Sequence, residues 1–197
     1  MREVELKAVV DDWSARRRQL EAAGARLTFA GRLEDRRFDT PERDLAARDE
    51  VLRLRVYRNE SRETAELGWK GPTSTADGYK VREELQAATG DAHSMERILG
   101  ALGYVVTRAI DREIVQYDFE GTIVRFEHYP RMDDLVEVEG TPEGIEHAIG
   151  ALGIPRSAFT AERLPAFVRR YQARTGATAA LCDAELAGAT PYDLEDA

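Results

Sequence analysis

Two carboxylates and an ammonium alternate with apolar residues at the start of the chain, as Glu3, Glu5 and Lys7 separated by Val4 and Leu6. In a β-strand successive side chains point to opposite faces, so the charged residues would share one face and the apolar residues the other. Carboxylates two residues apart on a strand are separated by roughly 7 Å, because each residue adds about 3.3 Å. They repel each other unless a positive charge lies between them, and a divalent cation meets that need.

One half-buried strand with a solvent-exposed face produces the same alternation without any ligand. Five later segments, however, also carry a charged residue at alternate positions: 51–56, 67–70, 80–85, 123–127 and 135–139. Recurrence in six segments favours a set of strands that share one charged surface.

The composition limits the class of protein. A chain of 197 residues with 43% hydrophobic residues suits one domain with a substantial core. The net charge of −9 argues against nucleic acid or anionic membrane as a partner for the whole surface. No apolar run approaches the roughly 18 residues that cross a bilayer, and no signal-type segment begins the sequence. Cys182 is the single cysteine, which excludes an internal disulfide and a thiolate zinc site, so a cytoplasmic protein is expected.

The periodicity and the turn residues predict strands and helices along most of the chain. Strands are expected at the N-terminus and near 26–39, 51–58, 63–70, 79–87, 104–119, 122–129 and 134–140, with a flexible loop at 73–78. Helices are expected after Asp11 and Asp12 to about residue 23, and near 92–102, 141–152 and 160–174. Residues 1–175 would form the domain, and 176–197 an Ala-rich, acidic tail that is mobile or docks weakly as a helix.

These elements predict an α+β fold, a closed eight-stranded antiparallel β-barrel that forms a tunnel with flanking helices. Closure removes exposed strand edges. Apolar strand faces would pack outward against the helices, and charged faces would line the interior. By alternation, the inward set is Glu3, Glu5, Lys7, Arg53, Arg55, Lys70, Lys80, Arg82, Glu84, Arg108, Arg112, Arg125, Glu127, Glu137 and Glu139.

Such a lining suits a polyphosphate with divalent cations. Basic groups bind phosphoryl oxygens, and carboxylates hold the metal. The hard cations Mg²⁺ or Mn²⁺ fit oxygen ligands better than zinc does, since the three histidines are scattered and no cysteine cluster exists.

Seven motifs, in order, resemble those of the CYTH superfamily, the triphosphate tunnel metalloenzymes that include class IV adenylyl cyclases, thiamine triphosphatases and inorganic triphosphatases. The first is similar to the family's ExExK signature, and the next three to its YFDTP, LRxR and LKGP motifs: 3–7, 37–41, 52–55 and 69–72. Segments 82–84, 111–113 and 136–139 follow in the family's order. The resemblance covers roughly residues 1–175.

The resemblance also implies a role for each charged residue of the tunnel. The metal ligands would be Glu3, Glu5, Glu127, Glu137 and Glu139. The triphosphate would be bound by Lys7, Arg53, Arg55, Lys70, Lys80, Arg82, Arg108, Arg112 and Arg125. Glu5, Lys7 and Glu84 would be the catalytic residues.

Some positions depart from the family pattern. Arg37 replaces a tyrosine, Glu127 an aspartate, and Ile110 a lysine for which Arg108 would substitute. These changes should affect the choice of substrate more than the binding of the metal.

The expected function is that of a Mg²⁺- or Mn²⁺-dependent phosphohydrolase of an organic or inorganic triphosphate such as ATP, thiamine triphosphate or tripolyphosphate. The alternatives are a class IV adenylyl cyclase, which makes cyclic AMP and pyrophosphate from ATP, and a non-catalytic module that binds polyphosphate. A lipocalin-like carrier of apolar ligands has little support, because it would need apolar residues on the strand faces where these charges lie. Neither a membrane nor a nucleic acid is expected as a partner, and the oligomeric state is left open, a homodimer included.

Overall fold

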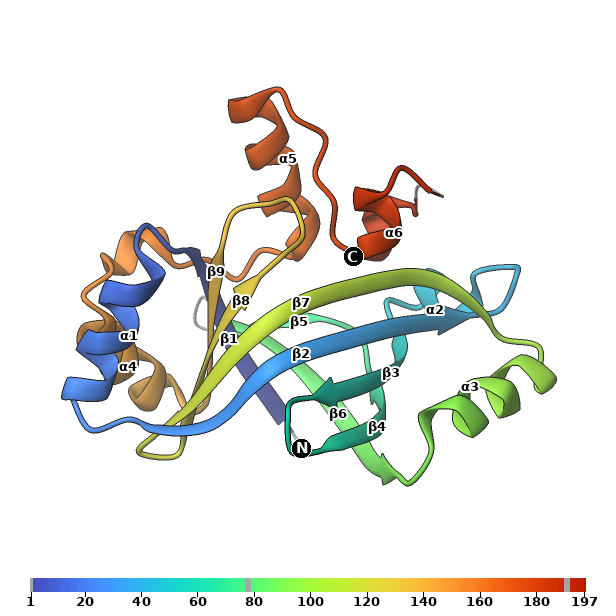
Figure 1. The fold of residues 1–197 in the computed structure, drawn as a ribbon, viewed down its shortest axis with the longest axis horizontal. Helices are drawn as coiled ribbons and strands as arrows, with labels where there is room; N and C mark the ends of the chain where they lie inside the picture. The colour runs from blue at the N-terminus through green and yellow to red at the C-terminus, as the bar shows by residue number, and fades with distance from the viewer. Residues whose placement is uncertain (1, 77–78, 190–191) are drawn as a thin grey trace.

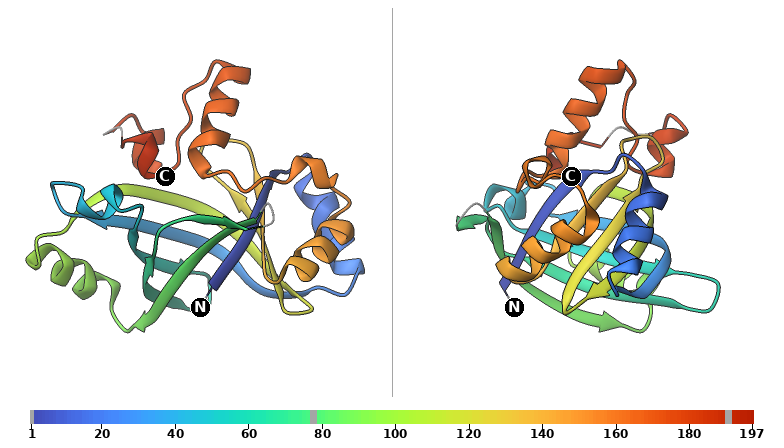
Figure 2. Two further views of the ribbon diagram at one scale, coloured as in Figure 1. Left: turned by 180° about the vertical axis from the view of Figure 1, so that it is seen from behind. Right: turned by 90° about the vertical axis from the view of Figure 1, so that its left-hand side faces the viewer.

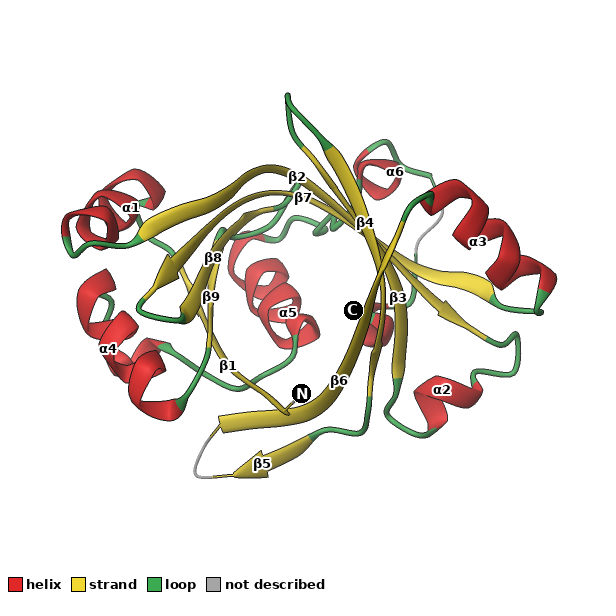
Figure 3. Cartoon of the chain, turned by 90° about the horizontal axis from the view of Figure 1, so that it is seen from below, coloured by secondary structure: helices red, strands yellow, loops and turns green. Residues whose placement is uncertain are grey.

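Nine strands form one antiparallel sheet in the computed structural model, which describes residues 2–76, 79–189 and 192–197. They are β1 (Arg2–Val9), β2 (Arg26–Asp39), β3 (Val51–Arg58), β4 (Glu63–Lys70), β5 (Ser74–Ala76), β6 (Tyr79–Thr89), β7 (Val105–Phe119), β8 (Thr122–His128) and β9 (Leu135–Glu139). The order is β1-β9-β8-β7-β2-β3-β4-β6-β5, and β1 also pairs with β6. Eight strands therefore close into a barrel, and β5 is an extra strand on β6 (Figure 3).

The predicted closed antiparallel barrel is confirmed, and the expected bounds of β2, β3 and β4 agree with the structure. The loop expected at 73–78 was wrong in part, because residues 74–76 form β5 and Ser74 pairs with Val81. The edge of β6 offers free backbone groups here, which a short extra strand satisfies. Residues 77 and 78 of that loop lie outside the described residues.

Two helices cover the outer side of the wall made by β1, β8 and β9 (Figure 1). α1 (Trp13–Ala22) is capped by Asp12, which accepts from the backbone N–H of Ala15 as expected, and α4 (Pro142–Leu152) is capped by Thr141. The core beneath them contains Leu6 and Ala8 from β1, together with Phe126, Val136 and Val138 from the neighbouring strands. The apolar faces of these strands thus point outward, as predicted.

Two further helices lie toward the opposite end of the barrel (Figure 2). The short α2 (Asp44–Ala47) follows β2, and α3 (Ala92–Ala101) packs Leu99 against Phe38 and Leu54. This second outer core supports β3, whose opposite face carries Arg53 and Arg55 inward.

Gly31 permits a close approach in the long strand β2. Its φ is +151°, and a Cβ built there would lie 2.4 Å from the carbonyl oxygen of Arg58. A side chain at this position would push β2 away from the end of β3.

The C-terminal fifth of the chain packs over one end of the barrel. α5 (Leu164–Thr175) begins later than the expected Thr160, because the backbone of Thr160 forms two hydrogen bonds of 2.9 Å with that of Lys7. Beyond α5, the backbone of Ala180 pairs with Arg131, and the carbonyl oxygen of Leu181 accepts from the N–H of Asp111.

Short helical segments complete the C-terminal region: η1 (Arg156–Ala158) before α5, then α6 (Asp183–Leu186) and η2 (Leu194–Asp196) after it. None of the helices in the described ranges has the length and apolar character needed to cross a bilayer.

Candidate active site

Charged side chains from neighbouring strands meet inside the barrel. On β1, Glu5 and Lys7 face the interior, whereas Leu6 lies in the outer core. The β1–β9 register places Glu5 opposite Glu139 and Lys7 opposite Glu137. Directly opposed residues share a face of the sheet, so two strands bring three carboxylates and an ammonium together.

The interior contains two adjoining compartments that share Arg53 and Arg55. The narrow compartment has a volume of about 70 Å³, and the wide compartment has a volume of about 690 Å³. In the described part of the chain, ten basic and seven acidic residues line the two, a local excess of three positive charges in a molecule of net charge −9. Twelve of the fifteen residues expected to face inward are among them: Glu5, Lys7, Arg53, Arg55, Lys70, Arg82, Glu84, Arg112, Arg125, Glu127, Glu137 and Glu139.

Lys7 lies between two carboxylates from adjacent strands. Its Nζ is 3.1 Å from Oε1 of Glu5 and 2.6 Å from Oε2 of Glu137. Burial alone would lower the pKa of Lys7, but Glu137 and Glu5 outweigh it and raise that pKa above its ordinary value. The pKa of Glu137 is lowered, because Lys7 and Arg125 overcome the effects of burial and of the Glu5 charge. Lys7 and Glu137 are therefore both ionised at neutral pH.

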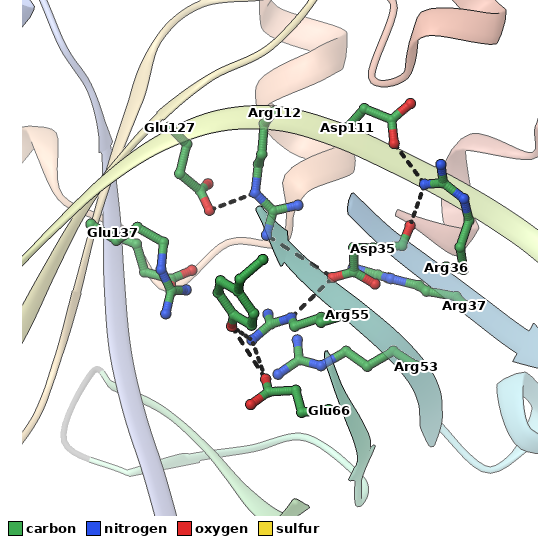
Figure 4. Close-up of polar contacts among 12 residues, drawn as sticks. Asp35, Arg36, Arg37, Arg53, Arg55, Glu66, Asp111, Arg112, Glu127 and Glu137 are labelled. Atoms are coloured by element: carbon green, nitrogen blue, oxygen red, sulfur yellow. Dashed lines mark hydrogen bonds and ion pairs between the residues drawn. The ribbon is translucent and has the colours of Figure 1, made fainter. Parts of the chain in front are cut away.

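A chain of ion pairs crosses the narrow compartment (Figure 4). Asp35 Oδ2 lies 3.2 Å from Nε of Arg55 and 4.0 Å from a guanidinium nitrogen of Arg112. Arg112 in turn donates to Glu127 at 2.9 Å, and the hydroxyl of Tyr129 donates to the other oxygen of Glu127 at 2.7 Å. Burial raises the pKa of Asp35, but the surrounding arginines, Arg55 first among them, lower it further than burial raises it.

A second cluster joins the strands at the other side of the interior. Glu84 accepts from Arg53 at 2.5 Å and lies 3.4 Å from Nζ of Lys70. These two cations keep the pKa of Glu84 below its ordinary value despite burial. Arg82 donates to the backbone carbonyls of Gly71 and Asp49, which ties the loops beside β4 to the barrel.

Arg125 connects the carboxylate group of β9 to the wide compartment. Its NH1 donates to Glu137 at 2.8 Å, and its Nε donates to the amide oxygen of Gln116 at 3.0 Å. The two bonds orient the guanidinium between Glu137, which lines the narrow compartment, and Gln116, which lines the wide compartment.

The prediction that Arg108 faces the interior was wrong. Arg108 donates both NH1 and NH2 to the carboxylate of Glu185, at 2.8 and 3.0 Å, and lines a separate pocket under the C-terminal segment. It lies on β7 beyond the point where β8 pairs with that strand. The side chains of Glu3 and Lys80 lie outside the described residues, although their backbones pair in the β1–β6 register.

The inward set predicted from alternation contained neither Asp35 nor Arg37. Both residues face the narrow compartment. Burial, together with the charges of neighbouring arginines, lowers the pKa of Arg37 to about 10. Charged residues occupy four consecutive positions from Glu34 to Arg37, so alternation gives no sign of which side faces inward. An inward apolar group, Phe29, Leu33 and Ile114, was also missed.

The carboxylate oxygens of the interior suit a hard divalent cation, and the described residues supply part of a metal site. No group of three or more His, Cys, Asp or Glu residues with metal-binding geometry occurs in the described ranges. Nevertheless, Glu5 and Glu137 converge on one position, which the ammonium of Lys7 occupies, and Glu139 lies opposite Glu5. Glu127 fits a ligand role less well, since both of its oxygens accept hydrogen bonds. Oxygen-only ligands favour Mg²⁺ or Mn²⁺ over softer metals.

The C-terminal region contributes to the wall of the narrow compartment. Arg163, Leu164 and Ala197 form part of its lining. Arg37 donates to the carbonyl oxygen of Asp196 at 2.6 Å, and Arg43 pairs with the carboxylate of the same residue. Basic residues at this end of the barrel are thus partly occupied by an acidic segment of the same chain.

A closed antiparallel tunnel with a charged interior defines the structural class, and the comparisons identify the family. The family model of the CYTH domain matches residues 1–147, so the chain belongs to the CYTH family. No curated protein matched the sequence.

Solved structures share the fold at low sequence identity. A putative adenylate cyclase from Vibrio parahaemolyticus aligns with a TM-score of 0.71 and 17% identity, over 85% of this chain and 97% of that one. A conserved hypothetical protein from Pyrococcus furiosus aligns with a TM-score of 0.67 and 18% identity, over 84% and 99% of the two chains. A putative adenylyl cyclase from Hippeastrum, described as having a dominant triphosphatase activity, aligns with a TM-score of 0.62 and 18% identity, over 91% and 98%. At these identities the likeness concerns the fold alone.

Proposed function

We propose that this protein is a divalent-metal-dependent phosphohydrolase that acts on an organic or inorganic triphosphate inside the barrel. The observation that carries the proposal is the meeting of ten basic residues with a converging group of carboxylates in the interior of the barrel. A buried charge is costly unless it is paired, and a lining with excess positive charge is best satisfied by a polyanion.

Arg55, Arg112 and Arg125 would bind the phosphoryl oxygens. Each is buried and engages a carboxylate, yet each planar guanidinium has five N–H donors and the carboxylates use only some of them. Further contacts with the phosphates would come from Lys70, Arg53 and Arg82, nearer to the loops that contain Asp49 and Gly71. A triphosphate could therefore add to the existing ion-pair network with little rearrangement of the strands.

Glu5, Glu137 and Glu139 would hold the metal, with Glu3 as a further candidate ligand. When bound there, Mg²⁺ or Mn²⁺ would neutralise phosphoryl charge and lower the pKa of a water for in-line attack. Glu137 is ionised over the neutral range because its pKa is lowered, which is the form a metal requires.

Lys7 and Glu84 would act through charge and position. Since the pKa of Lys7 is raised, the side chain stays a cation and suits charge stabilisation of a phosphoryl group, not proton abstraction. Glu84 stays an anion between Arg53 and Lys70 and would orient both toward the substrate.

An adenylyl cyclase is the second candidate, because one structural neighbour is described as a putative adenylate cyclase. The description of the Hippeastrum protein, where triphosphatase activity dominates, favours hydrolysis. A cytoplasmic location is proposed together with the function, on the basis of a single, buried cysteine.

A substrate panel tests the proposal. The protein is incubated with ATP, thiamine triphosphate or tripolyphosphate and Mg²⁺ or Mn²⁺, and free phosphate, pyrophosphate and cyclic AMP are measured. We expect phosphate release that stops on chelation of the metal. Formation of cyclic AMP with pyrophosphate would support the cyclase instead. Binding of tripolyphosphate without turnover of any substrate would indicate a non-catalytic polyphosphate-binding module.

A further inference from the structure

The wide compartment is much larger than phosphate recognition requires. Its volume of about 690 Å³ lies in the range of pockets that enclose organic ligands, whereas the narrow compartment measures about 70 Å³. The two share Arg53 and Arg55, so a ligand whose phosphates contact these arginines would extend directly into the wide compartment.

One wall of this compartment is apolar and aromatic. Phe29 and Tyr57 lie edge to face, with ring centroids 5.6 Å apart and an interplanar angle of 83°. Behind them, Leu33 and Ile114 complete a cluster that faces the inside of the barrel, since Leu33 lies opposite Arg112 and Tyr57 in the strand register. A polyphosphate gains nothing from such a wall, because only an apolar or aromatic group can bury its surface there.

Hydrogen bonds hold the aromatic wall in place beside the arginines. The hydroxyl of Tyr57 donates to Glu66 at 3.2 Å and accepts from NH1 of Arg55 at 3.4 Å. On the other side of Phe29, the amide of Gln116 accepts from Arg125 and bonds to the hydroxyl of Thr28. Aromatic surface, amide groups and phosphate-type arginines are therefore linked in one network.

We propose that this compartment receives the ring of an aromatic organic triphosphate of the nucleoside triphosphate class, with Phe29 and Tyr57 as specificity-determining residues. This proposal rests on the proposed triphosphatase function and narrows its substrate. The triphosphate would lie along Arg53, Arg55 and Arg125, and the ring would contact the wall of Phe29. Stacking on an aromatic face tolerates different bases, so the wall selects for a ring and not for one particular base.

The test compares ATP with tripolyphosphate in the wild-type protein and in two matched variants. Phe29→Leu keeps an apolar side chain but removes the ring, and Phe119→Leu makes the same change in the outer core, away from both compartments. We expect Phe29→Leu to raise the KM for ATP by about tenfold, the scale of one base–aromatic contact, with little change for tripolyphosphate. Phe119→Leu should leave the ratio of the two substrates unchanged.

Tyr57→Phe separates the ring from its anchoring hydroxyl and should raise the KM for ATP less than Phe29→Leu does. Equal effects of Phe29→Leu on both substrates, or equal kcat/KM for both in the wild type, would overturn the aromatic site while leaving the triphosphatase intact. Loss of turnover for every triphosphate in the wild type would instead remove the proposed function. Direct calorimetric binding of ATP and tripolyphosphate gives the same comparison without turnover.

Discussion

Lys7 shows how one residue decides the state of several others. Its ammonium lies between Glu5 and Glu137, which stand on adjacent strands and would otherwise face each other as buried anions. The pKa of Glu137 is lowered from its ordinary value of 4.5, so its ionised form stabilises the folded state at pH values above 4.5. This contribution is lost as the pH falls below that value.

Lys7→Met should reverse this pH dependence. Without the ammonium, the two carboxylates repel in a buried site, so the variant should lose about 3 kcal/mol of unfolding free energy near pH 7. Part of that loss should return as the pH falls toward about 5, because protonation of one carboxylate relieves the repulsion. Urea unfolding across this range measures the effect. Lys7→Arg keeps the charge and should follow the wild type; parallel curves for Lys7→Met and the wild type would contradict the account.

At the scale of elements, the barrel depends on strands that bend and approach one another closely. β2 pairs with β7 along its whole length and with β3 along half of it, and it supplies Phe29, Asp35 and Arg37 to the interior. Gly31 lies among these positions at a φ that disfavours a side chain and against the backbone of Arg58. The two compartments therefore depend on the shape of this strand.

Gly31→Ala should destabilise the protein by about 2 kcal/mol, because the new methyl group would require β2 and the end of β3 to separate. For a chain of this length that corresponds to a fall in Tm of about 4–8 °C. Gly90→Ala is the control, since a Cβ at Gly90 meets no atom within 4 Å. Thermal unfolding of both variants decides the point, and equal Tm values would show that the strand adapts to the side chain.

At the scale of the whole molecule, the C-terminal segment covers the end of the tunnel where the basic residues are densest. Leu194 and Ala197 pack into a core with α5, and this packing holds Asp196 against Arg37 and Arg43. Since Arg37 lines the narrow compartment, a triphosphate bound there would compete with this acidic segment for Arg37.

Leu194→Ser should weaken this docking and lower the KM for tripolyphosphate several-fold, because a larger fraction of molecules would have an open narrow compartment. Leu186→Ser provides the control in the same region, as Leu186 is 46% exposed and lies outside that core. Steady-state kinetics of the two variants compare them directly. An unchanged KM for Leu194→Ser would mean that the segment stabilises the fold without restricting access.

Much of this architecture was readable from residue order, because side-chain direction along a strand follows from its geometry. The alternation in β1, β3, β8 and β9 assigned inner and outer faces before any pairing was known, and Asp12 and Thr141 marked helix starts. The motifs resembling those of the CYTH superfamily agree with the match of the family model.

Other features depended on contacts between residues distant in sequence, which no local pattern encodes. Asp35 and Arg37 lie in a run of consecutive charges, so only strand pairing selects their side. Arg108 fits the alternation expected of an inward residue, yet its guanidinium pairs with Glu185, 77 positions away. This contact exists because the C-terminal segment folds over β7. The aromatic wall around Phe29 likewise exists only where β2, β3 and β7 come together, since a strand sets which way a side chain points but not what it meets.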